Sequence, residues 1–400
     1  MSRTCVNVLK PALVGALAAA SRFQNSVWTL DIDDERVRLP YIRSSPNYAI
    51  CGRKLPPMRA LAPCLLFAAL ACTGPNPPVL TPARTACALP PADSVWLTRA
   101  LSQWREIGEP LLRIEPGPVP HLILFDSECT YHVNLGERWN VTGGVHGGTI
   151  RLPNGRAIRP VGVGITSPTL RDTWVFLAIA LPATWRADPR YGFSETRAGW
   201  ERYLVGAFSH EMTHARMMPF VLPRLRGLEA VVYPDTVEDN AIQNRFGHDR
   251  AFAQSVRTET DLLYHAVIAP SASMRTQYIR TALTLMRERW DRYYVGDLAR
   301  WSELEQVFLD IEGIAQWVAF HVRWGGGTGA TRAPGSLFDR LLRRFREDRE
   351  FWSEDQGLLL ILALDTLVPE WQRQLLAPGA PTAFELLSRA VAPVAPPRER

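Results

Sequence analysis

The stretch TRAGWERYLVGAFSHEMTHARMM, residues 196–218, carries the strongest structural signal in this chain. Its apolar residues recur at helical spacing and Pro219 follows at once, so we predict a single helix that Pro219 ends. His210 and His214 are four residues apart, which places them one above the other on the same face. The apolar residues on and beside that face are Tyr203, Leu204, Ala207, Phe208, Met212 and Met217. The helix is therefore expected to bury two imidazoles.

His210, Glu211 and His214 form the pattern His-Glu-x-x-His, which is typical of a zinc site. Zinc binds imidazole nitrogens at about 2.0–2.1 Å, and two imidazoles on one helical face can reach the same ion. Glu211 lies one step round the helix, where its carboxylate can take the proton from an attacking water without binding the metal. The alternative is a pair of core histidines that are hydrogen-bonded to backbone or carboxylate groups. We prefer zinc because Glu211 has no role in that alternative.

A catalytic zinc needs a third protein ligand and an open position. The extension of the motif in metzincins requires a glycine and a histidine, and this chain has Met217 and Phe220 there, so we expect a carboxylate instead. The candidates are Glu238 and Asp239, which stand 24 and 25 positions after His214, Glu259 in RTETDLLYHAV, and Glu312 in LDIEGIAQWVAF.

The segment EGIAQW, residues 312–317, resembles the E-G-[LI]-A-[EQ]-[YW] segment of gluzincins, metallopeptidases of the MA clan in which that glutamate binds zinc. The two motifs together cover fewer than twenty residues. The resemblance implies zinc held by His210, His214 and Glu312, with Glu211 activating water, in a zincin-like fold. We therefore favour Glu312 and keep Glu259 as the main alternative.

The residues after Glu312 support this choice. Gly313 and Ala315 would let their helix approach the histidine helix closely, because small side chains shorten the distance between helix axes. Gln316, one turn after Glu312, could hydrogen-bond a metal ligand. Glu312 follows His214 by 98 positions, which is long for this clan, so the resemblance implies an inserted helical subdomain.

Strand signals come before the helical region, after a predicted helix over residues 92–112. The predicted strands are 121–126, 130–135, 148–153 and 174–182, with TGGVHGG (142–148) and PNG (153–155) as turns. The predicted helices are 196–218, 239–268, 273–294, 299–323, 335–348, 356–376 and 382–390. This order predicts an α+β protein of zincin type, with a β-rich part followed by a helical part. The run 174–182 is either a strand beside the active cleft, able to pair with an extended substrate, or a core strand.

Residues 58–78, MRALAPCLLFAALACTGPNPP, resemble a bacterial lipoprotein signal peptide. A basic residue and an apolar run precede Cys72, which would carry the lipid anchor. The apolar run is about 12 residues, too short to span a bilayer as a helix. A second candidate signal occupies residues 1–21, and the alternative to both is a buried apolar segment. We expect an exported protein, periplasmic or bound to the cell envelope.

The chain divides by composition into six segments. They are a leader of foreign composition (1–57), the signal peptide (58–72), a Pro-rich tether (73–91), the β-rich part (92–195), the helical catalytic part (196–390) and a tail (391–400). The net charge of +5 arises in residues 1–71, which have nine Lys and Arg against four Asp and Glu. The remaining chain is neutral, so we expect no nucleic-acid partner.

The six cysteines agree with export. Cys5, Cys51 and Cys64 would be removed with the leader, and Cys72 would carry lipid. The remaining two, Cys87 and Cys129, can form one disulfide in an oxidising periplasm or stay as thiols.

A peptidase of this kind also needs a group that stabilises the oxyanion. Tyr264, His265, His321 and Arg323 are the candidates, and none is preferred. His321 follows Glu312 by nine positions, on the opposite side of a helix, so it should not share the metal. His146 lies in a glycine-rich turn that either lines a cleft or is an ordinary hairpin loop.

These observations predict an exported zinc metallopeptidase whose substrate is a peptide or protein. The alternatives are an envelope lipoprotein without catalytic activity, whose zinc is structural or absent, and a zinc hydrolase that cleaves a non-peptide amide.

Overall fold

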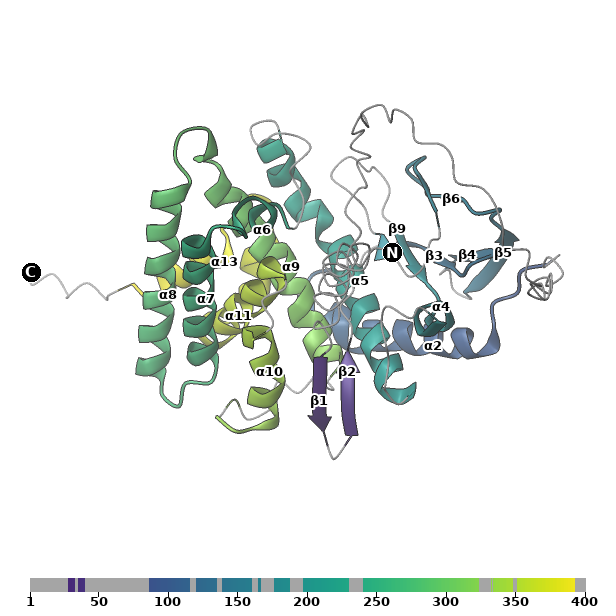
Figure 1. Cartoon of the computed structure of the whole chain (residues 1–400), viewed down its shortest axis with the longest axis horizontal. Helices are drawn as coiled ribbons and strands as arrows, with labels where there is room; N and C mark the ends of the chain where they lie inside the picture. Colours follow the sequence, from purple (N-terminus) through teal and green to yellow (C-terminus); the bar gives the residue numbers. More distant parts are fainter. Residues whose placement is uncertain are drawn as a thin grey trace, which may run out of the picture.

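The structure is a computed structural model, and it combines a small sheet with a larger set of helices (Figure 1). It describes residues 28–32, 35–39, 86–115, 120–134, 139–159, 165–166, 176–187, 197–229, 240–323, 332, 334–347 and 351–392. The sheet comes from the N-terminal part of the chain and the helices mainly follow it, so the predicted α+β class and the order of its two parts are confirmed.

The largest sheet has five strands in the order β5-β4-β3-β9-β8. Its strands are β3 (His121–Phe125), β4 (Cys129–Asn134), β5 (Asn140–Val145), β8 (Ile165–Thr166) and β9 (Phe176–Ala180). β3, β4 and β5 form an antiparallel meander, while β3 and β9 are parallel. Two short antiparallel pairs lie outside this sheet: β1 (Trp28–Ile32) with β2 (Glu35–Leu39), and β6 (Ile150–Arg151) with β7 (Ala157–Ile158).

Strand β9 is a core strand. All five of its residues are buried, and it lies between β3 and β8. Its register places Leu177 beside Leu122 and Ile179 beside Leu124, four side chains with no exposed surface. Of the two interpretations of residues 174–182, the structure therefore shows the core strand.

The predicted turn TGGVHGG is wrong in its first half. Residues 142–145 belong to β5, where Val141 pairs with Val133 and Gly143 with Tyr131. The ladder to β4 supplies partners for the backbone groups of the glycines, which outweighs their low preference for strands. The turn lies at His146–Gly148, where Gly147 and Gly148 have φ values of 57° and 83°. The predicted turn at 153–155 is confirmed and joins β6 to β7.

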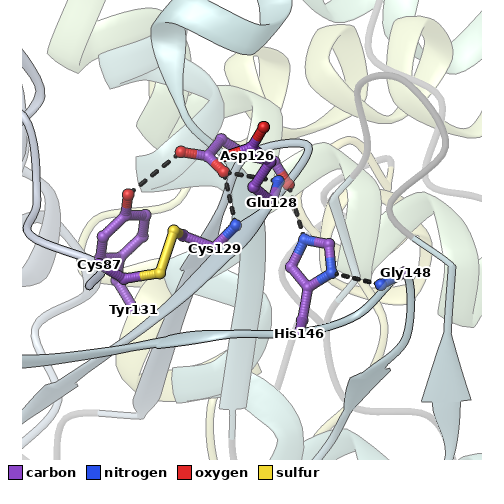
Figure 2. The surroundings of a disulfide bond; sticks show 7 residues. All are labelled: Cys87, Asp126, Glu128, Cys129, Tyr131, His146 and Gly148. Carbon is purple, nitrogen blue, oxygen red and sulfur yellow. Dashed lines mark hydrogen bonds between the residues drawn. A yellow bond between two sulfur atoms is a disulfide. The ribbon is translucent and has the colours of Figure 1, made fainter. Parts of the chain in front are cut away.

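A disulfide between Cys87 and Cys129 fastens the segment before the first described helix to β4, with the two Cα atoms 5.8 Å apart (Figure 2). The packing around it is tight, because a Cβ on Gly143 would lie 2.2 Å from the Cys87 carbonyl oxygen. Closing a loop of this length, 42 residues, stabilises a fold by about 4 kcal/mol in the chain-entropy account.

The helices cover most of the rest of the described chain. In order they are α2 (Pro91–Gln103), the π-helical turn η1 (Trp104–Gly108), α3 (Glu109–Leu112), α4 (Pro182–Ala187), α5 (Arg197–Glu229), α6 (Ala241–Phe246), α7 (Arg250–Val267), α8 (Ala272–Tyr293), the 3-10 turn η3 (Gly296–Leu298), α9 (Trp301–Arg323), α10 (Leu337–Glu347), α11 (Trp352–Leu367), α12 (Trp371–Leu375) and α13 (Ala383–Ala390).

Two predicted helices are each divided in two. The segment 239–268 breaks at Gly247–Asp249, and the Asp249 carboxylate caps α7 by accepting from the backbone N–H groups of Ala251 and Phe252. The segment 356–376 breaks before α12, where Glu370 has a φ of 54°. Asp249 caps the start of α7 and the left-handed Glu370 precedes α12, so a local feature begins a new helix at each break, although the apolar pattern continues across both.

Helix α5 does not end at Pro219, as we predicted, but continues to Glu229 with Pro219 and Pro223 inside it. A proline in a helix interior costs about 3 kcal/mol. The added turns bury Leu225 and Leu228, which are 2% and 0% exposed, and burying one leucine contributes about 1.5–3 kcal/mol. Burial of the two leucines, about 3–6 kcal/mol in all, is therefore comparable with the cost of the two prolines, about 6 kcal/mol.

Helix α9 lies at the centre of the helical part and packs against both α5 and α11. Figure 1 shows α5 and α9 between the sheet and helices α7, α8 and α11. Gly313 provides the close approach to α11, since a Cβ there would lie 2.5 Å from the Gly357 carbonyl group. We predicted that Gly313 would face the helix that carries His210 and His214, which is α5. This prediction is wrong, because Gly313 faces α11.

Candidate metal centre

His210 and His214 lie on one face of α5, as their spacing predicts, and both are largely buried, with 9% and 7% of their surface exposed. Their Nε2 atoms are 2.9 Å apart and their ring planes are nearly perpendicular, at 83°. The two rings therefore present the same nitrogen to one point between them.

Glu312 reaches that point from α9, and it is also buried. One of its carboxylate oxygens, Oε2, lies 3.3 Å from His210 Nε2 and 3.5 Å from His214 Nε2. Among the residues that the structure describes, this is the one group of three or more possible metal ligands within reach of a single ion.

The separations of these three atoms suit a tetrahedral metal ion. Ligands at 2.0–2.1 Å from a tetrahedral zinc lie about 3.3 Å from one another. The separations here are 2.9, 3.3 and 3.5 Å. Hydrogen bonds between the two histidines and the carboxylate would account for two of these three separations. All three atoms converge on one point, which fits the donor set of a metal site.

The charge state of Glu312 also fits this role. Burial alone would raise the pKa of its carboxyl group, but the facing His214 and His210 outweigh burial and hold the pKa well below its usual range. Glu312 is therefore an anion at neutral pH, which is the form that binds metal.

Glu211 follows His210 on the same turn of α5, and 5% of its surface is exposed. Its carboxyl group thus lies inside the fold, next in sequence to a ligand candidate. This position is compatible with the role of a general base.

The main alternative ligand, Glu259, lies elsewhere in the protein. Its carboxylate accepts two hydrogen bonds from Arg289, both 2.8 Å long, and a third of 3.0 Å from Gln356. Glu259 is fully buried in this ion pair and is not part of the histidine cluster. Glu238 and Asp239 lie outside the described residues.

Gln316 does not contact the cluster in the way we expected. Its side-chain amide donates to the Glu354 carboxylate of α11. Glu354 is itself buried. This hydrogen bond joins α9 to α11 one helical turn after Glu312, and nothing in the sequence around Glu354 indicated it.

Tyr264 and His265 of α7, two candidates for oxyanion stabilisation, contact residues of α10 and α8. The Tyr264 hydroxyl donates to the Asp339 carboxylate. The His265 ring lies against Tyr278, with 5.7 Å between the ring centroids. Their surroundings give neither residue a position at the cluster.

His321 and Arg323, the two oxyanion candidates of α9, lie too far along the helix from Glu312. His321 and Arg323 follow Glu312 by nine and eleven residues, about 14 and 16 Å along the axis at 1.5 Å per residue. The His321 Nδ1 atom is hydrogen-bonded to the Trp317 carbonyl oxygen at 2.7 Å, and the Arg323 guanidinium lies over the Tyr203 ring. The expectation that His321 does not share a metal with Glu312 agrees with this placement.

His146 belongs to the turn that joins β5 to β6, two strands of different sheets (Figure 2). Its Nδ1 accepts from the Gly148 N–H at 2.9 Å, which leaves the ring proton on Nε2 to donate to the Asp126 carbonyl oxygen at 3.1 Å. Both ring nitrogens thus stabilise the turn itself. The turn does not close a hairpin, because β5 pairs with β4 and β6 pairs with β7.

Arg216, two residues after His214, is a buried residue that the sequence analysis missed. Its guanidinium lies 3.1 Å from the Glu109 carboxylate and donates to the Glu115 carbonyl oxygen. These contacts hold α5 against α3 directly after the histidine pair. The sequence does place this cationic residue among the apolar residues of HARMM (214–218), a pattern that could have indicated a buried ion pair.

Comparison of the chain with protein-family models, curated proteins and solved structures gave no match.

Proposed function

We propose that this protein is a zinc-dependent hydrolase of gluzincin type that cleaves peptide bonds. The observation that carries the proposal is the convergence of His210 Nε2, His214 Nε2 and Glu312 Oε2 at separations suited to one tetrahedral ion. Two nitrogens and one anionic oxygen form the donor set of catalytic zinc sites, in which the fourth position stays open.

Each residue has a distinct task in this proposal. His210, His214 and Glu312 would hold the ion, which when bound supplies Lewis-acid chemistry at a substrate carbonyl and favours the ionisation of water. Glu211 would accept the proton of the attacking water and then donate it to the leaving amine. Arg216 would hold α5 in place beside them through Glu109.

The disulfide supports the proposed location. Disulfides persist in oxidising compartments such as the periplasm, and Cys87–Cys129 is such a bond. In the part of the chain that the structure describes, no helix has the length and apolar character to cross a membrane. The signal peptide and the anchor at Cys72 lie outside the described residues, so attachment through a lipid is part of the proposal.

Substitution of the general base tests the proposed reaction. Glu211→Gln should lower kcat on a quenched-fluorescent peptide library by roughly 10²–10⁴-fold, because proton transfer loses its acceptor. The zinc content, measured by elemental analysis, should stay at the wild-type value.

Glu288→Gln is the matched control, because Glu288 is exposed on α8. It should leave both readouts unchanged. Wild-type activity in Glu211→Gln would overturn the hydrolytic role. A wild-type protein that binds zinc and cleaves no peptide or amide would instead favour the envelope lipoprotein without catalytic activity.

A further inference from the structure

A second pair of histidines lies on the five-stranded sheet, on other elements than the α5–α9 cluster. His121 begins β3 and His132 lies within β4, and both are exposed. The His121 Nε2 and His132 Nδ1 atoms are 3.0 Å apart, and the ring centroids are 5.3 Å apart.

The strand register produces this contact. β3 and β4 are antiparallel, with Ile123 opposite His132 and Leu122 opposite Val133. Because side chains alternate between the faces of a sheet, His121 and Ile123 share a face, and His121 is the diagonal neighbour of His132. The pair is therefore held by a backbone ladder rather than by two mobile loops.

We infer that His121 and His132 form a second metal site, in which His121 Nε2 and His132 Nδ1 chelate one divalent transition-metal ion. Imidazole ligands suit copper, nickel and zinc, and copper(II) binds most tightly in the general order of affinities. A site of two imidazoles offers little to calcium or magnesium, which prefer oxygen ligands. Water would fill the remaining positions, so this site binds more weakly than one with three protein ligands.

Copper(II) titration of the full-length chain tests the site. The background is the triple variant His210→Ala, His214→Ala, Glu312→Ala, so that all three possible ligands of the α5–α9 cluster are removed whether or not it is catalytic. In this background one copper(II) should bind with an electron paramagnetic resonance spectrum of two nitrogen ligands. His121→Ala and His132→Ala should each weaken that binding at least tenfold.

His248→Ala is the matched control, because His248 is an exposed histidine outside the sheet. It should bind copper(II) as the background protein does. Unchanged affinity in His121→Ala and His132→Ala, or an equal loss in His248→Ala, would overturn the site. Hydrolytic activity of the His132→Ala single variant should equal that of the wild type, so the outcome for this site is read separately from the proposed function.

Discussion

At the scale of single residues, the choice between two buried glutamates determines the candidate site. Glu312 faces two imidazoles, while Glu259 faces the guanidinium of Arg289. Both carboxylates are almost without solvent, so burial does not distinguish them. The distinction lies in their partners, because an arginine satisfies a carboxylate by itself, whereas a pair of histidine nitrogens converging on one oxygen leaves room for an ion.

This distinction predicts opposite effects of two alanine substitutions on metal content. Glu312→Ala should reduce bound zinc to well below one ion per chain, since a ligand is lost. Glu259→Ala should retain zinc, provided that the variant folds. Elemental analysis after dialysis, with circular dichroism as a check of folding, measures both. Zinc loss confined to Glu259→Ala would reverse our assignment.

We expect the buried imidazole of His321 to contribute to the dependence of stability on pH. Burial lowers the pKa of its imidazole, more than the Trp317 carbonyl oxygen and Asp365 raise it. In the unfolded chain the His321 imidazole binds a proton near pH 6.5, whereas in the folded chain it stays neutral at that pH. The free energy of unfolding therefore falls as the pH drops below about 6.5. The loss is at most about 1.4 kcal/mol per pH unit until the folded pKa is reached.

Replacement of His321 by asparagine should make the acid limb of the stability curve less steep. An asparagine amide can still donate to the Trp317 carbonyl oxygen and does not titrate. Urea unfolding of both proteins between pH 7.5 and 5, with exposed His248→Asn as control, measures the difference. Parallel curves for wild type and His321→Asn would contradict the prediction.

At the scale of elements, one buried arginine ties four helices together. Arg289 of α8 pairs with Glu259 of α7 and Glu305 of α9, and Gln356 of α11 donates to Glu259. Trp290 and Tyr294 also donate to Glu305. Glu305 stands two helical turns before Glu312, so this network positions the helix that carries the candidate ligand.

Removal of the arginine should strongly destabilise the protein, because it leaves two carboxylates buried without a cation. We expect Arg289→Met to lower the free energy of unfolding by about 3–5 kcal/mol. The triple variant Arg289→Met, Glu259→Gln, Glu305→Gln should recover much of this loss. Urea unfolding at pH 7 measures it, and a loss below about 1 kcal/mol in Arg289→Met would mean that the network is not important for stability.

Most elements could be predicted from local pattern, and their ends could not. The apolar run of β3 and the helical spacing of apolar residues in α9 are properties of a few neighbouring residues. The continuation of α5 past Pro219 depends on where Leu225 and Leu228 are buried, and the strand at 142–145 depends on the presence of β4. Such effects arise from partners distant in the chain, which local pattern does not contain.

At the scale of the whole molecule, the disulfide joins the segment before α2 to the sheet, and α5 and α9 lie between the sheet and helices α7, α8 and α11 (Figure 1). The bond agrees with the oxidising compartment that we propose. It should contribute above all to holding the segment before α2 on the β-rich part, since Cys87 precedes α2 and Cys129 lies in β4.

Replacement of Cys87 and Cys129 by serine should lower the free energy of unfolding by about 4 kcal/mol, because the unfolded chain gains the freedom of an open loop. Thiol titration of protein secreted into an oxidising compartment should find neither cysteine reactive. Two reactive thiols in the denatured, unreduced protein would contradict the disulfide and remove its support for export.

The sequence by itself determined that His210 and His214 share a face beside Glu211, because a spacing of four residues has the same consequence in any α-helix. It also determined the α+β order of the elements. Only the tertiary structure decided that Glu312, 98 positions beyond His214, faces the histidines while Glu259 faces Arg289. It likewise decided that Gly313 contacts α11. The physical reason is that contacts between helices depend on how their faces pack together, which no short stretch of either helix contains.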